Sequence, residues 1–578
     1  MLDKYTLGLN FLHSDSSACL FKNNQLIAAS EEERFTRVKH TSNFPINSIN
    51  FCLKEANINI SKIDLVTVNT NPFSGILKKI YYVLSNFSAL RIVISSLLNS
   101  KKKINLSKMI LEIDKKNNFR GRIKYVDHHE SHIASSLFFS NFNECANLSI
   151  DGFGDFASCA YGLYQKNHLN IDHKINFPHS LGIYYQALTQ FLGFKSYGDE
   201  YKLMGLSSYG EPKYINEISK IIFKTSKGFR LNLKYFIHHK KKIFHLNSNG
   251  QFIYENLYSN SLKTLLGKER DINENISQKH LDLAKSTQVV YEDILQHLVN
   301  IVYKKYESEN LTISGGCAMN SLANGKIIKN SKFKNIYISP NPGDAGGSIG
   351  SASLVLSKEL NKKITTSNYS YLGPNYNNQE ISNLIIKKKL EEKFKVKYFE
   401  DSDLYSFVAN EISKEKIIGW FQGKAEWGPR ALGNRSILAD PRNYKIKDII
   451  NLKIKRRENF RPFAPSILRD HVKDWFEEDA DVPYMSEVRM VKENKRELIP
   501  GVVHVDGSGR LQTVTKNQNH HYYNLIQEFY NQTGVPIILN TSFNENEPIV
   551  SKPEEALDCF LRTKMDTLVM EDYIIKRI

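Results

Sequence analysis

The sequence predicts an α/β protein made of two large domains. Its 578 residues correspond to about 3.9 domains of roughly 150 residues each, which suits two large domains with sub-lobes. Hydrophobic residues make up 41% of the chain and charged residues 24%, close to the globular average, which excludes wholesale disorder and fibrous repeats. Short apolar runs repeatedly precede glycine-rich loops and helix-like stretches, and this alternation is typical of α/β folds.

The N-terminal part of the chain begins with strands. Residues 5–30 alternate short apolar runs with a polar turn at 22–24, which predicts a hairpin, and residues 63–68 predict a further strand. From 72 to 120, apolar residues recur at helical spacing among many lysines, which predicts a basic helical insertion. Two interpretations of this insertion stay open: a cap or partner face with a function, and a solvated amphipathic surface without one.

Three glycine-rich loops follow predicted strands, at residues 151–155 (DGFGD), 314–320 (SGGCAMN) and 341–347 (NPGDAGG). Glycine lets a ligand approach the backbone, and the helix N-termini that follow the last two loops can receive a phosphate. Each loop alone could be a plain turn. Three of them in one domain favour the duplicated nucleotide-binding lobes of actin-like and sugar-kinase-like proteins. The sequence has no Walker A motif.

A histidine cluster precedes the first of these loops. His128, His129 and His132 lie within five residues, and an apolar helix-like stretch follows them. If the segment is helical, His128 and His132 share one face and two neutral imidazoles can bind one metal ion. The competing interpretation is a surface or capping role.

The C-terminal half carries arginine-rich turns after a polar stretch at 361–377, which is the predicted linker. The turns predict an anion site, because arginine offers a rigid fork to phosphate or carboxylate. The alternative is that these arginines pair with Glu426, Asp440 and Glu458. The motifs lie at residues 422–436, 455–465, 504–510 and 540–544.

Charge and cysteine content point to a compartment and to partners. The net charge of +17 suggests anionic partners or a lysine-rich solvated surface. Six cysteines without a C-x-x-C pair favour a reducing compartment. The start of the chain is not patterned as a signal peptide, and the longest apolar stretch, 89–98, is too short to span a bilayer. We therefore expect a soluble cytoplasmic protein with no membrane span.

Together these motifs resemble the O-carbamoyltransferases of the nodulation-factor and antibiotic (NodU/CmcH) type. The resemblance covers nearly the whole chain in the expected order, although the stretch 72–120 matches none of the motifs. It rests on LGLNFLHSDSSACL, EEERFTRVKH, HHESH, DGFGD, SLGIYYQALTQFLGF, KLMGLSSYG, SGGCAMN, NPGDAGG, EWGPRALGNRSILADPR, FRPFAPS, HVDGSGRLQTV and LNTSFNENEPIV.

The resemblance implies a fold and a reaction. Residues 1–360 would form an actin-like (ASKHA, threonylcarbamoyltransferase-like) domain, and residues 378–578 a YrdC-like α/β domain. In such enzymes carbamoyl phosphate and ATP give carbamoyl-adenylate in the YrdC-like domain. The carbamoyl group then passes to an acceptor hydroxyl at a metal site, iron in related enzymes, in the N-terminal domain.

The resemblance also assigns residues in the N-terminal domain. It implies His128, His132, Asp151 and Asp344 as ligands of a divalent metal, a set that suits Fe²⁺, Mn²⁺ or Zn²⁺, with Fe²⁺ expected. It places Gly182, Gly316 and Asn320 near the adenylate.

In the C-terminal domain we expect Arg430, Arg457 and Arg510 to bind phosphate. Lys424 replaces the arginine expected at its position, which keeps the charge but loses bidentate geometry.

Two further residues are candidates for catalysis. His13, in a His-x-Asp turn, has an intrinsic pKa suited to a general base, although it could also only cap a turn. Lys39, in EEERFTRVKH, is the second candidate catalytic residue.

Other functions remain open. A tRNA-modifying carbamoyltransferase would use the same intermediate, an actin-like sugar kinase or ATPase would need no carbamoyl phosphate, and a non-catalytic module could bind nucleic acid or a membrane surface. Our expectation is a small-molecule acceptor with a hydroxyl group and no nucleic acid. A homodimer is compatible with the sequence, and the basic charge favours an acidic or phosphorylated acceptor.

Overall fold

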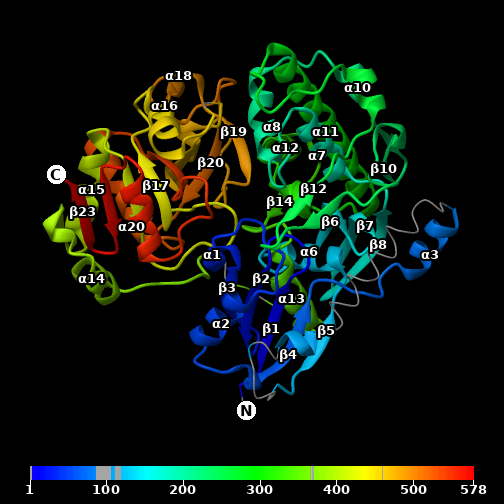
Figure 1. Ribbon diagram of the computed structural model, residues 1–578, viewed down its shortest axis with the longest axis horizontal. Helices are drawn as coiled ribbons and strands as arrows, with labels where there is room; N and C mark the ends of the chain where they lie inside the picture. The colour runs from blue at the N-terminus through cyan, green and yellow to red at the C-terminus, as the bar shows by residue number, and fades with distance from the viewer. Residues whose placement is uncertain are drawn as a thin grey trace. The chain divides into compact units, whose positions relative to one another are not determined.

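The computed structural model describes residues 3–85, 106–110, 113, 119–364, 366, 370–458 and 460–578. It divides into two compact units, Met1–Asn368 and Tyr369–Ile578 (Figure 1). Their border falls inside the stretch 361–377 that the sequence suggests as a linker. Among the described residues, no helix combines the length and the apolar character needed to cross a bilayer.

The first sheet of unit 1 consists of β1 (Tyr5–Asn10), β2 (Ser17–Lys22), β3 (Gln25–Glu31), β4 (Ile63–Val68) and β5 (Arg122–Tyr125). Its strand order is β3-β2-β1-β4-β5. The first three strands form an antiparallel meander, and β4 and β5 add parallel strands beside β1. The expected hairpin and the expected strand at 63–68 are both present.

The second sheet of unit 1 consists of β6 (Cys145–Gly154), β7 (Ala157–Gln165), β8 (His168–Asn176), β13 (Asn310–Ser314) and β14 (Asn335–Ile338). Its strand order is β14-β13-β6-β7-β8. Strands β6, β7 and β8 form an antiparallel meander, and β13 and β14 add parallel strands beside β6. The two sheets therefore share one topology.

One strand is longer than the sequence suggests. A strand ending near residue 150 was expected, with DGFGD as the loop after it, but β6 runs on through Gly154. Its pairing with β7 shifts register between Ile150 and Gly154, where the glycines tolerate an irregular backbone.

Two helices occupy corresponding places after the last strand of each sheet. α6 (His128–Leu137) packs on β6 and β13, α13 (Gly346–Leu360) packs on β1 and β4, and the two helices pack on each other. Gly350 permits this approach, because a β-carbon there would lie 1.8 Å from the carbonyl oxygen of Ser131. Ser131 and Gly350 lie in the first two turns of their helices, so the N-terminal ends of α6 and α13 lie close to each other.

The other elements of unit 1 surround the two sheets. Among them is the 29-residue helix α11, Gln278–Tyr306. The remaining bounds are α1 Glu33–Thr36, α2 Ile46–Glu55, α7 Leu181–Phe191, α8 Glu200–Leu206, α9 Ile215–Ile218, β9 Ile222–Thr225, β10 Gly228–Leu231, β11 Phe244–Leu246, β12 Phe252–Tyr254, α10 Asn260–Leu266 and α12 Ser321–Asn330.

The predicted basic insertion at 72–120 contains two described helices, α3 (Ile76–Ser85) and α5 (Leu106–Ile110). The rest of that prediction, at 86–105, 111–112 and 114–118, lies outside the described residues.

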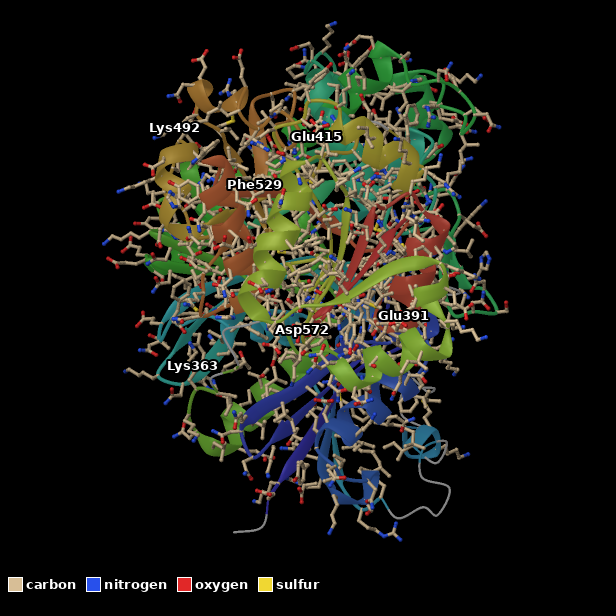
Figure 2. The ribbon with its side chains drawn as sticks, turned by 90° about the vertical axis from the view of Figure 1, so that its left-hand side faces the viewer. Lys363, Glu391, Glu415, Lys492, Phe529 and Asp572 are labelled. Atoms are coloured by element: carbon tan, nitrogen blue, oxygen red, sulfur yellow. The ribbon has the colours of Figure 1, made fainter. Side chains whose placement is uncertain are left out.

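Unit 2 is built on a nine-stranded mixed sheet in the order β15-β23-β22-β16-β17-β21-β18-β20-β19. Phe529 lies in its core, whereas Glu391 and Glu415 are exposed (Figure 2). Its strands are β15 Phe394–Tyr398, β16 Ile418–Phe421, β17 Arg435–Ala439, β18 Ala464–Leu468, β19 Glu487–Met490, β20 Ser508–Val514, β21 Ile537–Ser542, β22 Thr567–Met570 and β23 Tyr573–Arg577. Its helices are α14 Asn378–Lys387, α15 Asp401–Ser413, α16 Ile446–Ile450, α17 Val472–Trp475, α18 Glu493–Arg496, α19 His520–Thr533 and α20 Pro553–Arg562.

Candidate functional site

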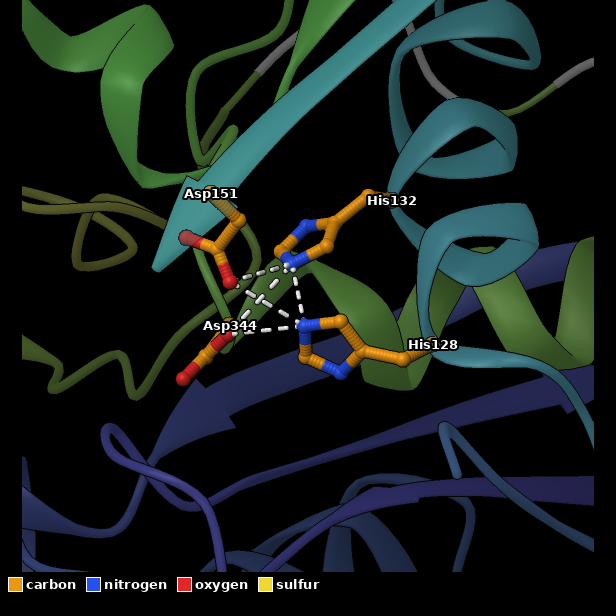
Figure 3. Close-up of side chains that lie close together, drawn as sticks. All are labelled: His128, His132, Asp151 and Asp344. Carbon is orange, nitrogen blue, oxygen red and sulfur yellow. Dashed lines mark hydrogen bonds and ion pairs between the residues drawn. The ribbon is translucent and has the colours of Figure 1, made fainter. Parts of the chain in front are cut away.

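Four side chains of the type that binds metals converge in unit 1 (Figure 3). The Nε2 atoms of His128 and His132, both on α6, lie 3.0 Å apart. The Oδ2 atom of Asp151, on β6, lies 3.1 Å from the first nitrogen and 3.6 Å from the second. The Oδ1 atom of Asp344, in the loop before α13, lies 3.5 Å and 3.3 Å from the same nitrogens. One donor atom from each residue therefore lies within 4.8 Å of the other three.

Local structure explains this convergence. The two imidazoles are four residues apart on a helix and so share a face. Asp127 caps that helix, because its Oδ1 atom accepts hydrogen bonds from the N–H groups of His129 and Glu130, at 3.1 and 3.3 Å. The ring of His128 lies against Gly154, where a β-carbon would come within 2.0 Å of the ring. The second glycine of DGFGD thus leaves room for the histidine.

The donor set fits a divalent metal. Metal bonds of about 2.0–2.2 Å place neighbouring donor atoms roughly 2.8–3.6 Å apart, as the nitrogen and oxygen atoms are here. Asp344 Oδ1 is buried and accepts no hydrogen bond from a described residue. Burial lowers the pKa of His132, but the carboxylates of Asp151 and Asp344 raise it to about 10. The two carboxylates of the cluster therefore stabilise a positive charge that lies between them.

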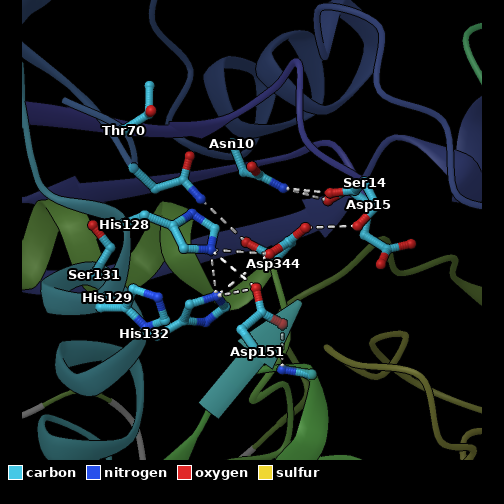
Figure 4. A network of polar contacts seen from close by, with 12 residues as sticks. Asn10, Ser14, Asp15, Thr70, His128, His129, Ser131, His132, Asp151 and Asp344 are labelled. Carbon is cyan, nitrogen blue, oxygen red and sulfur yellow. Dashed lines mark hydrogen bonds and ion pairs between the residues drawn. The ribbon is translucent and has the colours of Figure 1, made fainter. Parts of the chain in front are cut away.

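A second layer of polar contacts orients Asp344 (Figure 4). The Ser14 hydroxyl donates to Asp344 Oδ2 at 2.6 Å and lies 2.5 Å from the Tyr197 hydroxyl. Asn10 holds the turn by donating to the Ser14 carbonyl at 2.9 Å. Sequence reasoning missed Ser14, although it directly follows His13 in the opening motif and could have been considered with it.

Asp155, the last residue of DGFGD, forms hydrogen bonds at the N-terminus of α6, the helix that carries His128 and His132. Its carboxylate accepts hydrogen bonds from the Thr70 hydroxyl at 2.7 Å, the Asn71 N–H at 2.7 Å and the His128 N–H at 2.9 Å. Asp155 and Phe156 both have left-handed backbones, with φ of 49° and 69°. Such geometry is uncommon outside glycine and indicates a turn that its surroundings maintain. Asp155 therefore lies in a turn, as one interpretation of this motif predicts. Its carboxylate also accepts from the backbone N–H of His128, one of the four clustered residues.

Replacing Asp155 by asparagine should lower the affinity of unit 1 for a divalent metal by about 10- to 100-fold, the usual effect of losing an outer-shell partner. Asparagine tolerates the left-handed backbone, but it is uncharged and offers one acceptor oxygen where the carboxylate offers two to three donors, so the bonds that hold the His128 backbone are weakened. Titration calorimetry with Mn²⁺ measures the affinity. Asp293→Asn, at an exposed carboxylate on α11, is the matched control and should leave the affinity unchanged. Equal affinities for both variants would contradict the role given to Asp155.

The glycines predicted to lie near an adenylate adjoin the cluster, whereas the asparagine is occupied. A β-carbon on Gly182 would come within 3.1 Å of the Asp151 carbonyl oxygen, and the Gly316 N–H donates to Asp151 Oδ1 at 2.9 Å. Asn320 exchanges two hydrogen bonds of 3.0 Å with Gln288.

The two predicted catalytic residues lie in different surroundings. The His13 ring lies 4.7 Å, between centroids, from the ring of His128, so it adjoins the cluster. Lys39 follows α1 and precedes His40, whose Nδ1 atom lies 2.7 Å from Asp15 Oδ1. Burial lowers the pKa of His40, but the Asp15 carboxylate raises it to about 9. Sequence reasoning missed this histidine–carboxylate pair beside the opening turn.

In unit 2 the structure brings two of the predicted phosphate ligands together. Burial and the positive charge of Arg430 hold the pKa of Arg510 well below its usual value. Arg430 lies in the loop between β16 and β17, and Arg510 lies on β20. Lys424 belongs to the same loop as Arg430, and its carbonyl accepts from the Asn434 amide at 2.8 Å. Glu426 Oε1 accepts hydrogen bonds from the backbone N–H groups of Leu432, Asn434 and Arg435.

Arg457 lies in a turn that a buried lysine connects to β21. The Arg457 Nε donates to Asn451 Oδ1 at 2.8 Å. Lys455, 1% exposed, donates to the carbonyl oxygens of Ser542 and Asn544 at 2.5 and 2.8 Å. Two of the predicted motifs, 455–465 and 540–544, therefore meet at this lysine.

Other arginines in or near these motifs have structural partners, as the alternative interpretation expects. Arg442 pairs with Asp440 at 2.6 Å, and Arg461 pairs with Glu458 at 2.8 Å. The buried Arg435 donates to four backbone carbonyl oxygens and stacks 3.6 Å from the centre of the Phe421 ring.

Two family models match most of the chain. The family model described as Carbamoyltransferase N-terminus matches residues 5–353, and Carbamoyltransferase C-terminus matches residues 409–577. The chain belongs to the carbamoyltransferase family. It is therefore an enzyme that transfers a carbamoyl group, as the sequence motifs predicted.

Several curated proteins are similar to this carbamoyltransferase over most of its length. Protein sll1178 of Synechocystis is 38% identical, covering 99% of this chain and 97% of that protein. Nodulation protein NolNO of Sinorhizobium fredii is 34% identical, covering 98% of this chain and 79% of its own length. Among solved structures, HypF of T. kodakarensis is 14% identical with a TM-score of 0.31, covering 63% of this chain and 48% of its own.

Proposed function

We propose that this carbamoyltransferase is an ATP-dependent O-carbamoyltransferase that works in two steps. In the first, water converts carbamoyl phosphate to carbamate and orthophosphate, and the carbamate displaces pyrophosphate from ATP to give carbamoyl-adenylate. In the second, a hydroxyl of a sugar or secondary metabolite attacks the carbamoyl carbon, AMP leaves, and the hydroxyl proton passes to a base. The observation that carries the proposal is the cluster of His128, His132, Asp151 and Asp344, a metal-type site within unit 1.

The donor chemistry supports a divalent metal at the cluster. Two imidazoles and two carboxylates suit Fe²⁺, Mn²⁺ or Zn²⁺, and we propose Fe²⁺ from the resemblance of the motifs. When bound, such a metal supplies Lewis acidity and orientation for the carbamoyl group. Ser14 fixes one carboxylate, and Asp155 holds the backbone of the helix that carries both histidines.

The remaining roles follow from position and charge. His13, whose ring lies 4.7 Å from that of His128, is our candidate for accepting the proton of the attacking hydroxyl. Lys39, our second candidate catalytic residue, adds a positive charge next to His40, which contacts Asp15 of the opening motif. In unit 2, Arg430, Arg510, Arg457 and Lys424 would stabilise the charge that develops on phosphate oxygens when pyrophosphate leaves.

We further propose that unit 1 is actin-like and unit 2 YrdC-like. The support for unit 1 is its repeated sheet topology, which is what a duplicated nucleotide-binding lobe requires. We place the enzyme in the cytoplasm, since all six cysteines carry free thiols.

Pyrophosphate release with ATP and no acceptor tests the proposal. Release that requires carbamoyl phosphate is the expected result. Orthophosphate release from ATP that carbamoyl phosphate does not change would point to an ATPase or kinase and would overturn the proposal. Because the first step is assigned to unit 2, loss of metal from the cluster in unit 1 would not explain a negative result.

A further inference from the structure

His40 lies where three separate segments of unit 1 meet. Its Nδ1 atom is 2.7 Å from Asp15 Oδ1, and its backbone N–H donates to Glu33 Oε2 at 3.1 Å. Its ring lies at 80° to the ring of Tyr197, with the centroids 5.2 Å apart. A β-carbon on Gly198 would come within 2.5 Å of its Nε2 atom. The imidazole is therefore enclosed by the turn before β2, by α1 and by the loop before α8.

The turn that carries Asp15 needs support from its surroundings. Leu12 and Asp15 both have left-handed backbones, with φ of 58° and 56°, which residues other than glycine seldom adopt. Such a turn persists only where neighbouring groups maintain it. The Asn10 amide donates to the carbonyl oxygens of Ser14 and Asp15, at 2.9 and 2.8 Å, and the Asp15 carboxylate contacts His40. Loss of His40 would thus remove one of the supports of this turn.

The same turn contacts the cluster through Ser14 (Figure 4). The Ser14 hydroxyl donates to Asp344 Oδ2 at 2.6 Å. Because its one proton is engaged there, the Tyr197 hydroxyl, 2.5 Å away, donates to the Ser14 oxygen. Tyr197 in turn stacks on Tyr254, with the ring centroids 5.6 Å apart. Two routes therefore lead from His40 to Asp344, one along the turn and one through Tyr197.

Charged groups surround His40, and their balance favours its protonated form. The carboxylates of Asp15, Glu33 and Glu200 and the ammonium of Lys39 all act on it. Burial lowers the pKa of His40, but Asp15 above all raises it to about 9, with help from Glu33 and against Lys39. Burial raises the pKa of Glu200 to about 7, so this carboxyl group titrates before His40 as the pH rises. The ion pair of His40 with Asp15 is therefore intact at neutral pH and is lost as the pH rises through about 9.

We propose that protonated His40 is a positioning residue for the cluster and holds the Ser14 hydroxyl against the Asp344 carboxylate. It acts through Asp15 and the turn, and through Tyr197, rather than by contact with the cluster. A carboxylate that is already held in one orientation loses less freedom when a metal ion binds, so the cluster binds the ion more tightly. This role rests on the proposed function, in which the cluster holds a divalent metal.

Titration of the full chain and its variants with Mn²⁺ tests the role. His40→Gln keeps a polar side chain but cannot carry the charge, so the affinity for Mn²⁺ at pH 7 should fall by about 10-fold, as for a lost outer-shell partner. Ser14→Ala should show a similar loss. Adding His40→Gln to Ser14→Ala should have no further effect, because both act on the same contact. His168→Gln, at an exposed histidine on β8, is the matched control and should bind Mn²⁺ like the original protein.

The dependence on pH separates the effect of charge from an effect of packing. Under argon, the ratio of the Mn²⁺ affinities of the original protein and His40→Gln should be largest at pH 7 and should decrease as the pH rises through about 9. Titration of the cluster's own histidines affects both proteins and cancels in this ratio. A side chain that only filled space would give a ratio that stays constant with pH.

A measurement on the original protein makes the test independent of folding in the variants. With histidine labelled at Cε1, the magnetic resonance signal of His40, assigned by its loss in His40→Gln, should titrate near pH 9. The proposal is overturned if that signal titrates near the ordinary value of about 6.5, or if the affinity ratio does not change with pH. It is also overturned if His40→Gln binds Mn²⁺ like the control, or if the double variant binds it more weakly than Ser14→Ala. Pyrophosphate release without acceptor reports the proposed function separately.

Discussion

Replacing His132 by glutamine is expected to abolish carbamoyl transfer while carbamoyl-adenylate formation continues. His132 supplies one of four donor atoms within 4.8 Å, and its loss leaves two carboxylates with less compensating charge and the metal with fewer ligands. Because Lewis-acid stabilisation is worth several kcal/mol, transfer should fall by about 10³-fold or more. Carbamoylated acceptor measures the second step, pyrophosphate release measures the first, and the bound metal is measured in the same samples.

His129→Gln is the matched control for this experiment. His129 is buried on the same helix, but its Nδ1 atom lies 2.8 Å from the Ser149 hydroxyl and it takes no part in the cluster. This variant should keep its metal and most of its transfer activity. Equal loss of transfer in both variants, or loss of pyrophosphate release in His132→Gln, would contradict the assignment of the two steps to separate sites.

Two of the four clustered side chains, His128 and His132, could be predicted to lie together from their spacing in the sequence alone. The two histidines lie four apart in a segment that reads as a helix, so a shared face follows from helical geometry. Asp151 and Asp344 come from other segments, and only the family resemblance joined them to the histidines before the structure brought all four together. The repeated topology of the two sheets was suggested by the glycine loops, since similar loops at strand ends imply similar units.

Other features depend on tertiary contacts that no spacing rule contains. Asp155 reaches the His128 N–H only because two consecutive residues adopt left-handed backbones. The sequence of α3 is amphipathic whichever face is buried, and contacts of Lys79 and Tyr82 with distant segments decide it. Likewise, nothing in the motifs distinguishes Arg435, which binds carbonyl oxygens, from Arg430, whose charge acts on Arg510.

Replacing Arg510 by methionine is expected to remove ATP binding without destabilising the ligand-free enzyme. Burial and the neighbouring Arg430 lower the pKa of Arg510, which means that its charged form is held at a cost in free energy. An anion between the two guanidiniums would offset that cost. Methionine removes one of the two like charges, so the melting temperature without ligand should stay equal or rise, as is common where stability is sacrificed for function. Pyrophosphate release should fall by about 100-fold or more.

The control for Arg510→Met is Arg442→Met, which alters an arginine of the same unit that is paired with a carboxylate. Arg442 is bonded to Asp440 at 2.6 Å, so its loss should lower the melting temperature and leave ATP binding intact. Thermal melts with and without ATP, together with pyrophosphate release, distinguish the two variants. If Arg510→Met lowered the melting temperature and still showed the upward shift with ATP, Arg510 would be a structural residue and the anion site would have to be sought at Arg457 and Lys424. The opposite behaviour of the two variants is what we expect if Arg510 serves phosphate binding and Arg442 serves the stability of the fold.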